Sequence, residues 1–526
     1  SPLPSLQGLI LRDRNRACRG WWLYRLVVTF EEMGTSMDQE VIPKTILNWI
    51  DGEECEAITG DTFGKLSPVS GKELGRVARS RVEDVQKAIQ VARRAQPAWA
   101  DSTPVYRGDL LYDIAQAMRK QQEEIASIVS LETGMSFKQA LGETGGAIAQ
   151  GEFMAGEGRR LYGRTTTSAV PNKYAMVVRQ PLGVAGLIIA ANTPIANVAW
   201  KVFPALICGN AAVLKAAEDT PATGWIVGRI AKEVGLPPGV LNIIQGYGEE
   251  AGAPLVASPE VDVISFTGST EVGRQIAEVA GRRLAKVSLE LGGKNPLVVC
   301  DDADLENAAN WVLLSAFSNA GQRCASGSRI IIFDSIYEKF RNLLVERTEK
   351  LKVGPGDDDD FGPVINEVQL TNMLSAIERA REKGAVVLTG GHRLTDPAHV
   401  DGFYMAPTIL ENVDPQDEIS TKEIFGPITC LYRVQDFAEA LSLANDSPYG
   451  LTACIHTRSI HRAIEFTQKI QAGVAMVNAG TYGSEPHMPF GGLKQSGNGT
   501  REPGTEALDV YSDLKDIYIN IDTEML

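Results

Sequence analysis

The run Val184-Ala185-Gly186-Leu187-Ile188-Ile189 is an apolar stretch of strand length, and it opens a series of similar runs separated by helical stretches. The next members of the series are residues 211–214, 240–244 and 261–266. Strands that alternate with helices are typical of parallel βαβ units, which build doubly wound sheets. A second series of such runs comprises residues 296–299, 329–333 and 385–388. The pattern therefore predicts an α/β protein with two doubly wound domains.

Other stretches of the chain predict the elements around these sheets. Residues 80–160 carry apolar residues at helical spacing, which predicts a helical segment. Residues 164–178 and 508–521 are β-prone, and each predicts a peripheral strand. Exposed strand edges invite pairing with another subunit, so these strands are expected to form an oligomerisation arm. The spacing allows equally that they complete a sheet within one subunit.

Length and charge limit the classes of function. The chain has 526 residues, too many for one hydrophobic core, so two or more domains are expected. Its net charge of -15 argues against a nucleic-acid partner, because phosphate binding needs a basic surface. No apolar run has the length needed to span a bilayer, so no membrane association is expected.

The cysteines and histidines also limit the chemistry. The seven cysteines form no CxxC pair and are odd in number, which indicates a reducing compartment and a cytoplasmic location. The five histidines show no metal-ligand spacing, so no metal site is predicted.

Residues 1–36 differ from the rest of the chain. Four arginines precede an apolar run at 20–30, which superficially resembles a signal peptide. However, Arg25 interrupts that run, no cleavage pattern follows it, and Met37 begins a more ordinary sequence. We expect residues 1–36 to be an N-terminal extension that is disordered or not native. Targeting or membrane association is the alternative.

Two turns carry candidate catalytic groups. Cys324 lies among glycine and polar residues at 321–326, and Glu290 lies in the turn-rich stretch 289–296. A thiolate attacks carbonyl carbons, and a nearby carboxylate activates the water that later releases the acyl group. Most cysteines are small buried hydrophobic residues instead. A cysteine hydrolase with a histidine partner is a further alternative, although no histidine is near Cys324 in sequence.

Two further motifs indicate a nucleotide site. In the stretch 266–273, Gly268, Ser269 and Gly273 close an apolar run and open a helix, an arrangement suited to phosphate. A plain tight turn explains this motif equally well. Lys215 and Glu218 follow another strand and could bind ribose hydroxyls, with the carboxylate favouring NAD over NADP. The alternative is an ordinary charged helix start.

Five segments in order are similar to signature motifs of the NAD(P)-dependent aldehyde dehydrogenase superfamily. They are residues 266–273, 289–294, 321–324, 423–427 and 489–494. The resemblance extends from about Ile46 to Ile519 and implies two Rossmann-like α/β domains with a β arm. Members that transfer the acyl group to coenzyme A lack the glutamate base, so Glu290 implies the hydrolytic type, with a free carboxylic acid as product.

The resemblance also implies catalytic roles. Cys324 would attack the aldehyde to give a thiohemiacetal. Asn192 and the Cys324 backbone N–H would form the oxyanion hole. After hydride transfer leaves a thioester, Glu290 would activate the hydrolytic water.

The same comparison of motifs implies the cofactor and its contacts. NAD is the expected cofactor, with NADP less favoured. Lys215 and Glu218 would bind the adenosine ribose, Gly248 and Ser269 would lie in the pyrophosphate region, and Glu423 and Phe425 would contact the nicotinamide ribose.

Departures from the family pattern bear on the substrate. Ala190, Ala191 and Thr193 surround Asn192 where Pro-Trp and Phe are common, so the wall is smaller and more polar. Trp200 and Ser318 stand where succinic semialdehyde dehydrogenases have arginines, which disfavours a substrate held by those two arginines.

A second stretch also bears on the substrate. Tyr482 and His487 belong to the expected substrate funnel and could hydrogen-bond a polar substrate, or they could be structural. The expected substrate is a small polar or aromatic aldehyde or semialdehyde.

These inferences give a division of the chain. Residues 37–159 and 180–292 are expected to bind NAD, 293–492 to form the catalytic domain, and 160–179 and 493–526 to form the arm. A homodimer or homotetramer is expected. A catalytically silent binding or structural protein of the same fold, or a cofactor-independent cysteine hydrolase, is the alternative. Retention of Cys324, Glu290 and Asn192 favours the enzyme.

Overall fold

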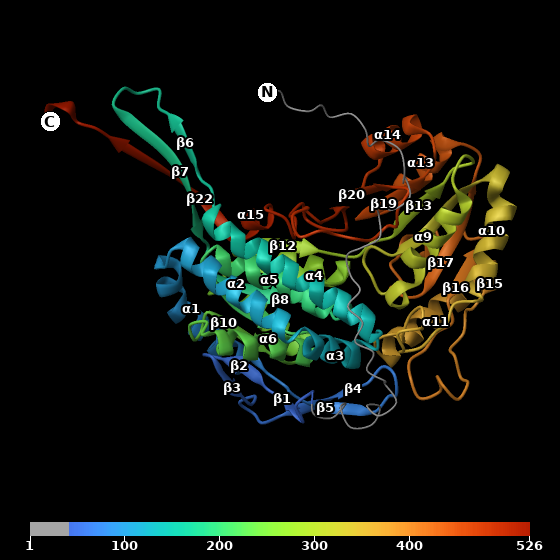
Figure 1. Ribbon diagram of the computed structural model, residues 1–526, viewed down its shortest axis with the longest axis horizontal. Helices are drawn as coiled ribbons and strands as arrows, with labels where there is room; N and C mark the ends of the chain where they lie inside the picture. The colour runs from blue at the N-terminus through green and yellow to red at the C-terminus, as the bar shows by residue number, and fades with distance from the viewer. Residues whose placement is uncertain (1–40, 526) are drawn as a thin grey trace, which may run out of the picture.

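The computed structural model of the protein describes residues 41–525, so the predicted extension at 1–36 lies outside the described residues. Two seven-stranded sheets lie at opposite ends of the body, and a β arm projects from one of them (Figure 1). The expectation of an α/β protein with two parallel-strand sheets is confirmed. Among residues 41–525, no helix combines the length and the apolar character needed to cross a membrane.

The first sheet contains the strand series that the sequence predicts. Its spatial order is β12 (Lys286–Glu290), β11 (Val263–Thr267), β8 (Val184–Ile188), β9 (Ala211–Lys215), β10 (Leu241–Ile244), β2 (Asn48–Ile50) and β3 (Glu53–Cys55). The first five strands are parallel, whereas β2 and β3 are antiparallel to their neighbours. All residues of β8, β9 and β10 are buried, which explains their continuous apolar sequence.

Helices cover both faces of this sheet and pack into two separate cores. One core joins it to α1 (Val82–Asp101), α7 (Ala253–Ala257) and α8 (Thr270–Gly281). The other joins it to α2 (Pro104–Lys120), α3 (Gln122–Thr133), α4 (Phe137–Gly156), α5 (Pro194–Ile207) and α6 (Pro221–Val234). The predicted helical segment at 80–160 is therefore confirmed as α1 to α4. A small sheet of β1 (Thr45–Ile46), β5 (Glu73–Ala78) and β4 (Thr62–Leu66) lies beside these elements (Figure 1).

The second sheet repeats the doubly wound plan. Its order is β15 (Val386–Thr389), β16 (Thr408–Glu411), β17 (Ile428–Val434), β14 (Gly327–Phe333), β13 (Asn295–Val299), β19 (Thr452–His456) and β20 (Val474–Val477). All neighbours are parallel except the pair of β15 and β16. One core includes α9 (Leu305–Phe317) and α10 (Asp334–Thr348), and the other includes α11 (Glu367–Glu382), α13 (Phe437–Asn445) and α14 (Ile460–Lys469).

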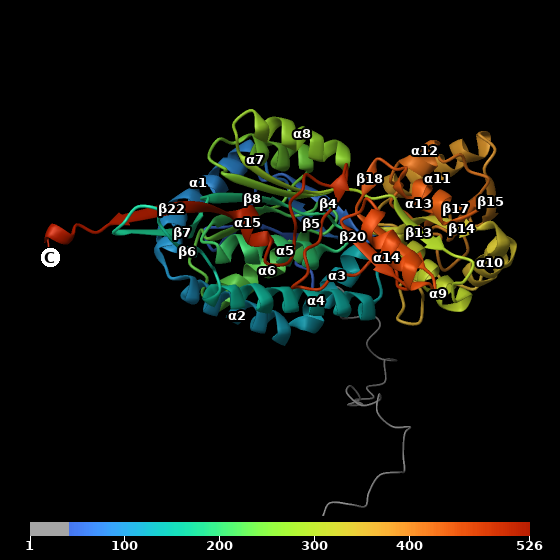
Figure 2. The same cartoon turned by 90° about the horizontal axis from the view of Figure 1, so that it is seen from above.

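The two predicted peripheral strands pair with each other within one chain. β22 (Ser512–Asn520) runs antiparallel to β7 (Lys173–Pro181), which pairs with β6 (Arg164–Thr167). This three-stranded arm extends away from the body in both views (Figures 1 and 2). Residues 493–511, which the predicted division groups with the arm, contact the body: β21 (Leu493–Lys494) pairs with β18 (Tyr449–Gly450), and α15 (Ala507–Tyr511) packs on α5.

Candidate active site

Cys324 lies in the loop between α9 and β14, and this loop has an unusual backbone. Asn319, Ala320 and Gly321 all have left-handed φ values, of 54°, 52° and 66°. Non-glycine residues in this region carry strain and persist only where the surrounding structure holds them, often at functional sites. At Gly321 a Cβ would overlap the carbonyl oxygen of Gly426, so only glycine fits.

Neighbouring elements hold the backbone of Cys324 in place. Asn295 at the start of β13 donates from Nδ2 to the carbonyl oxygens of Cys324 and Ser326, at 2.7 and 2.9 Å. A Cβ at Gly293 would overlap the Cys324 carbonyl oxygen. Burial, with Glu423 and Glu290 nearby, raises the pKa of the Cys324 thiol to about 12. The resting group is therefore a neutral thiol at neutral pH.

Glu290 ends β12, at the carboxyl end of the first sheet, where ligands bind in open α/β sheets. The residue is 5% exposed, and neither carboxylate oxygen has a hydrogen-bond partner among the described residues. Burial, followed by the charge of Glu502, raises the pKa of Glu290 well above its usual value. A carboxylate with free oxygens and a raised pKa is suited to accept a proton.

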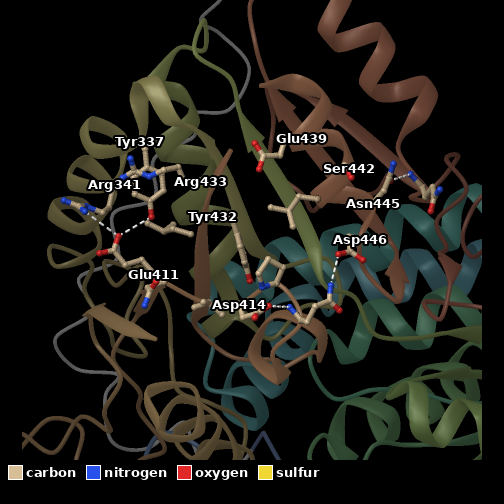
Figure 3. Close-up of a pocket in the computed structure, with 17 residues that line it drawn as sticks. Tyr337, Arg341, Glu411, Asp414, Tyr432, Arg433, Glu439, Ser442, Asn445 and Asp446 are labelled. Atoms are coloured by element: carbon tan, nitrogen blue, oxygen red, sulfur yellow. Dashed lines mark hydrogen bonds and ion pairs between the residues drawn. The ribbon is translucent and has the colours of Figure 1, made fainter. Parts of the chain in front are cut away.

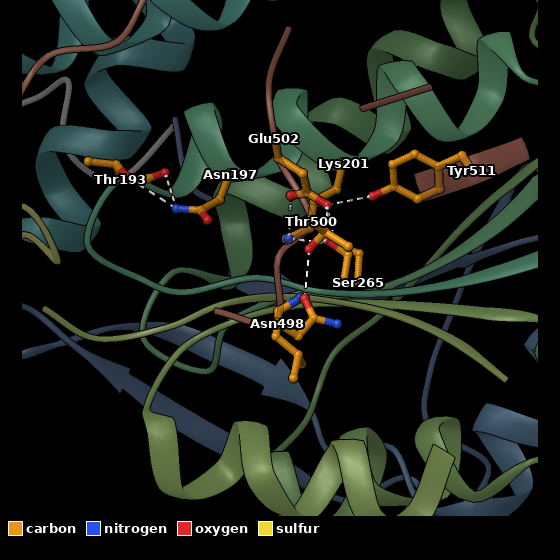
Figure 4. Close-up of polar contacts among 10 residues, drawn as sticks. Thr193, Asn197, Lys201, Ser265, Asn498, Thr500, Glu502 and Tyr511 are labelled. Atoms are coloured by element: carbon orange, nitrogen blue, oxygen red, sulfur yellow. Dashed lines mark hydrogen bonds and ion pairs between the residues drawn. The ribbon is translucent and has the colours of Figure 1, made fainter. Parts of the chain in front are cut away.

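A fully buried polar network that acts on this carboxylate includes Lys201, Ser265, Glu502 and Tyr511 (Figure 4). Lys201 Nζ lies 2.8 Å from Glu502 Oε2, and the Ser265 hydroxyl donates to Glu502 Oε1 at 2.6 Å. The Tyr511 hydroxyl donates to the same oxygen at 3.1 Å. Glu502 and Lys201 act on the pKa of Glu290 in opposite directions. The network therefore sets the electrostatic environment of the candidate base.

Asn192 precedes α5 and reaches the loop that carries the thiol. Its Nδ2 donates to the Gln322 carbonyl at 2.9 Å, and its own carbonyl accepts from Asn319 Nδ2 at 3.0 Å. A side-chain amide has two N–H donors, so the second donor is free to bind a substrate oxygen.

Two cavities meet at these three residues. One has a volume of about 470 Å³ and the other about 430 Å³. Four residues line both cavities: Asn192, Thr267, Glu290 and Cys324. The predicted nucleophile, base and oxyanion donor are therefore brought together at a junction open from two sides.

The larger of the two cavities contains half of the predicted cofactor residues. Gly268, Ser269, Glu423 and Phe425 line it. Ser269 is the N-cap of α8, so the backbone N–H groups of the first turn face this end of the helix. Glu423 Oε1 accepts from the Gly293 N–H at 2.9 Å, and burial raises the pKa of Glu423 to about 7.

The other four predicted cofactor residues do not line this cavity. Lys215, the last residue of β9, forms an ion pair with Glu218 at 2.6 Å, and the glutamate side chain is 42% exposed. Gly248 opens a single turn at 248–252 and has open space where a Cβ would be. At Gly273 a Cβ would overlap Leu291, so this glycine permits close packing of α8 on the chain after β12.

The smaller cavity likewise contains half of the predicted substrate residues. Trp200 and Tyr482 line it, together with Phe490, whose ring centre lies 5.4 Å from that of Trp200. Ser318 and His487 are not among its lining residues. The Ser318 hydroxyl is buried without a partner among residues 41–525, and His487 is exposed at 3.5 Å from Glu485.

A third and larger concavity, of about 1150 Å³, is lined by residues of α10, β16, β17 and α13 (Figure 3). Its polar groups bind one another: the Tyr337 hydroxyl donates to Glu411 at 3.2 Å, and Gln416 donates to Asp446 at 2.8 Å. It contains none of the predicted site residues. Among the described residues, no cluster of three or more histidine, cysteine or acidic side chains could hold a metal ion.

Several residues at the junction were not predicted. Thr267 and Arg323 lie next to predicted residues in quoted segments, so position in the motif was the available signal. Asn295, which holds the loop of Cys324, lies in the quoted stretch 289–296. Glu143 and Gln150 also line the smaller cavity but lie on α4. Nothing in the helical periodicity of α4 shows which of its faces meets a cavity.

Comparisons with known proteins agree with this geometry. Residues 56–517 match the model of the aldehyde dehydrogenase family. The α-ketoglutaric semialdehyde dehydrogenase of Bacillus subtilis is 39% identical over 478 residues, covering 90% of this chain and 98% of that protein. A mitochondrial aldehyde dehydrogenase of Leishmania tarentolae is also 39% identical, covering 89% of this chain and 94% of the relative.

Solved structures show the same likeness. The crystal structure of betaine aldehyde dehydrogenase from Staphylococcus aureus in complex with NAD⁺ has a TM-score of 0.89 at 34% identity. The match covers 91% of this chain and 95% of that one.

Proposed function

The chain belongs to the aldehyde dehydrogenase family, and from that premise we propose that it oxidises an aldehyde to a carboxylic acid with NAD through Cys324. The substrate is a small polar or aromatic aldehyde or semialdehyde. The observation that supports these roles is the junction of two cavities at Asn192, Glu290 and Cys324. An aldehyde entering from one side and a nicotinamide from the other would meet at the thiol.

The first step is addition of the thiol to the carbonyl carbon. Because the Cys324 thiol is protonated at rest, its proton leaves as the S–C bond forms, and Glu290 is the nearby group with free oxygens to take it. The free N–H of the Asn192 side chain donates a hydrogen bond to the developing oxyanion. One such donor typically contributes about 10²- to 10³-fold in rate.

The second half of the reaction releases the product. When bound, NAD supplies the acceptor for the hydride, so that the thiohemiacetal becomes a thioester on Cys324. After Glu290 has released the first proton to solvent, it takes a proton from water as the hydroxide adds to the acyl carbon. The C–S bond then breaks, and the leaving sulfur takes that proton back from Glu290, which gives the carboxylic acid and the Cys324 thiol. General-base assistance of this kind contributes about 10²- to 10⁴-fold.

The cofactor residues follow from the larger cavity. Ser269 and the α8 N-terminus would hold phosphate oxygens, and Glu423 with Phe425 would hold the nicotinamide ribose. The Lys215–Glu218 pair would bind the adenosine ribose, and its carboxylate would disfavour a 2′-phosphate. The donor set thus fits a dinucleotide with free ribose hydroxyls. We assign residues 37–159 and 180–292 to NAD binding and 293–492 to the catalytic domain.

The assembly and the location are also proposed. Tyr174, Leu514, Tyr518 and Ile519 on the arm are 48–61% exposed, an unusual amount of apolar surface for a projecting sheet. We propose that the arm pairs with another subunit in a homodimer or homotetramer. Six cysteines of the described chain are free thiols, which supports a reducing, cytoplasmic environment.

The Cys324→Ala variant tests the central role. It is expected to form no NADH from any aldehyde while binding NAD as the wild type does, because the cavity for the cofactor is unchanged. NADH absorbance measures the first result and calorimetric titration with NAD the second. The matched control is Cys55→Ala, on β3 outside both cavities, which should keep full turnover. Turnover in the Cys324→Ala variant would exclude the thiol mechanism, and a wild type that forms no NADH would favour a silent protein.

A further inference from the structure

Helix α4 presents a row of residues to the substrate cavity, and three of them have polar side chains. Gln139, Glu143, Gly146 and Gln150 all line it. Spacings of four, three and four residues place these positions on one face of a helix. This face borders the smaller cavity, on the side that does not lead to the cofactor residues.

Gln150 is the most deeply buried member of this row. It is 1% exposed, and neither its Nε2 nor its Oε1 has a hydrogen-bond partner among the described residues. Gln139 Oε1 and Glu143 Oε2 are likewise buried and without partners. A buried polar group without a partner is costly, so several of them around one cavity indicate a polar ligand.

Arg323 supplies the positive charge of the same cavity. Its guanidinium carbon lies 4.9 Å from the centre of the Tyr482 ring, and its Nε is buried without a hydrogen-bond partner. Among residues 41–525 it forms no ion pair with a carboxylate. A guanidinium held against an aromatic ring with free donors is suited to bind a carboxylate through two parallel hydrogen bonds.

Apart from Glu290, the cavity has two acidic side chains, and they offset the positive charge of Arg323 only weakly. Glu485 is 72% exposed at the rim, so solvent and salt screen it. Glu143 Oε1 accepts backbone N–H groups of Ile195 and Ala196 at 3.0 and 3.2 Å. Burial raises the pKa of Glu143 to about 7, so much of it is a neutral acid near neutral pH and can donate from Oε2.

We propose that the substrate is an ω-oxo carboxylate, whose aldehyde reaches Cys324 while its distal carboxylate binds Arg323 and the amide of Gln150. Trp200 and Phe490 supply the apolar wall for the methylene groups between them. This recognition rests on the proposed aldehyde oxidation. It differs from the pattern of succinic semialdehyde dehydrogenases, which have arginines at the positions of Trp200 and Ser318, because Trp200 is an apolar wall here and Ser318 does not line the cavity.

The test compares two aldehydes of equal chain length, one anionic and one neutral, with a shorter cationic aldehyde. Glutaric semialdehyde, pentanal and betaine aldehyde are each oxidised by the wild type with NAD, and kcat/KM is measured from NADH absorbance. We expect glutaric semialdehyde to exceed pentanal by about 10- to 100-fold, the range of one charge-assisted recognition contact. Betaine aldehyde, which is cationic, is expected to be the poorest of the three.

Variants then assign that preference to a residue. Arg323→Met should lower the ratio of kcat/KM for glutaric semialdehyde to that for pentanal by about 10- to 100-fold. Arg323→Lys, which keeps the charge but not the planar fork, should give an intermediate ratio. The control Arg458→Met removes an exposed arginine outside the cavities and should leave the ratio unchanged.

Three results would overturn the proposal. Equal or better use of pentanal or betaine aldehyde by the wild type would exclude a carboxylate receptor, even if the variants fail to fold. An equal loss on both aldehydes in Arg323→Met would show that Arg323 acts on the thiol and does not select the substrate. NADH from none of the aldehydes would reject the proposed function itself, a result distinct from the other two.

Discussion

Glu290 shows how one residue combines burial with reactivity. Its carboxylate is 5% exposed, lacks hydrogen-bond partners within the described chain, and has a raised pKa caused mainly by burial. An ordinary surface glutamate would be ionised but solvated, and therefore a weak base. The same burial raises the pKa of the Cys324 thiol, because removal from water disfavours the charged form of either group.

The Glu290→Gln variant is expected to form one equivalent of NADH rapidly and then to turn over at least about 100-fold more slowly than the wild type. The amide keeps the shape of the side chain but cannot take a proton from water, so the thioester accumulates. Rapid-mixing absorbance resolves the burst, and intact mass spectrometry detects the acylated Cys324.

The pH dependence gives a second readout of the same residue. Because the folded pKa of Glu290 is raised, its basic form increases as the pH rises, so acyl release in the wild type should accelerate with pH. The Glu290→Gln variant should lose this dependence. Steady turnover near that of the wild type in the variant would assign the base to another group.

The Glu218→Ala variant addresses cofactor choice. Glu218 is paired with Lys215 at 2.6 Å, and removing its carboxylate leaves the lysine free to bind a 2′-phosphate. The ratio of kcat/KM for NADP to that for NAD is expected to rise by about 10-fold or more. The control Glu233→Ala removes an exposed carboxylate of α6. An unchanged ratio in Glu218→Ala would mean that this residue does not face the ribose.

At the scale of the element, the loop from α9 to β14 determines where the thiol points. Three successive left-handed residues at 319–321 turn the chain, Asn295 holds two carbonyl groups of the loop, and the Thr481 hydroxyl donates to the Ala325 carbonyl at 2.6 Å. These contacts come from β13 and from the segment after β20. The loop is therefore held by the second sheet, while Glu290 is held by the first.

The Gly321→Ala variant tests this loop. A methyl group there would meet the Gly426 carbonyl and would also force an alanine into a left-handed conformation, so we expect a loss of about 2 kcal/mol or more in unfolding free energy. Activity should fall with it. Urea denaturation and NADH formation measure the two effects.

The control for this variant is Gly281→Ala at the end of α8, where a Cβ meets nothing within 4 Å. Alanine there should be neutral or slightly stabilising, because it favours helix. A Gly321→Ala protein as stable and as active as the wild type would show that the loop has room that this structure does not give it.

At the scale of the whole molecule, two sheets supply the two halves of the chemistry. The first sheet carries Glu290 and the α8 N-terminus, and the second carries the loop of Cys324. The C-terminal segment leaves the second sheet after β20 and returns to the first, where Glu502 lies beside Lys201 of α5 (Figure 4) and Tyr511 leads directly into the arm strand β22. The position of the arm is thereby tied to the polar network that acts on the base.

The double variant Leu514→Asp, Tyr518→Asp tests the arm. Two carboxylates on this exposed apolar strand should block pairing with another subunit, so the molecular mass in solution should fall to that of a smaller species. Size-exclusion chromatography with light scattering gives the mass, and circular dichroism checks the fold. The control Asp516→Asn, on the same strand, should keep the mass of the wild type. An unchanged mass in the double variant would reject the arm as the interface.

The fold and the chemical groups were readable from local sequence. Continuous apolar runs such as 184–189 form buried parallel strands because both faces of such a strand are covered by helices. Cys324 and Glu290 were candidates because of the turns in which they stand, whereas Asn192 was a candidate only through the resemblance to the family pattern. The edge strands at 164–178 and 508–521 left two pairings open, and the structure pairs them within one chain.

The sequence by itself determined the doubly wound sheets, because hydrophobic periodicity is a property of neighbouring residues along the chain. Only the tertiary structure decided which side chains share a cavity. Gln150 and Arg323 are far apart in sequence, yet both line the substrate cavity. Ser318 is close to Arg323 in sequence but does not line it. That selection depends on the packing of α4 against α5 and on the strained turn at 319–321, and no local pattern contains either.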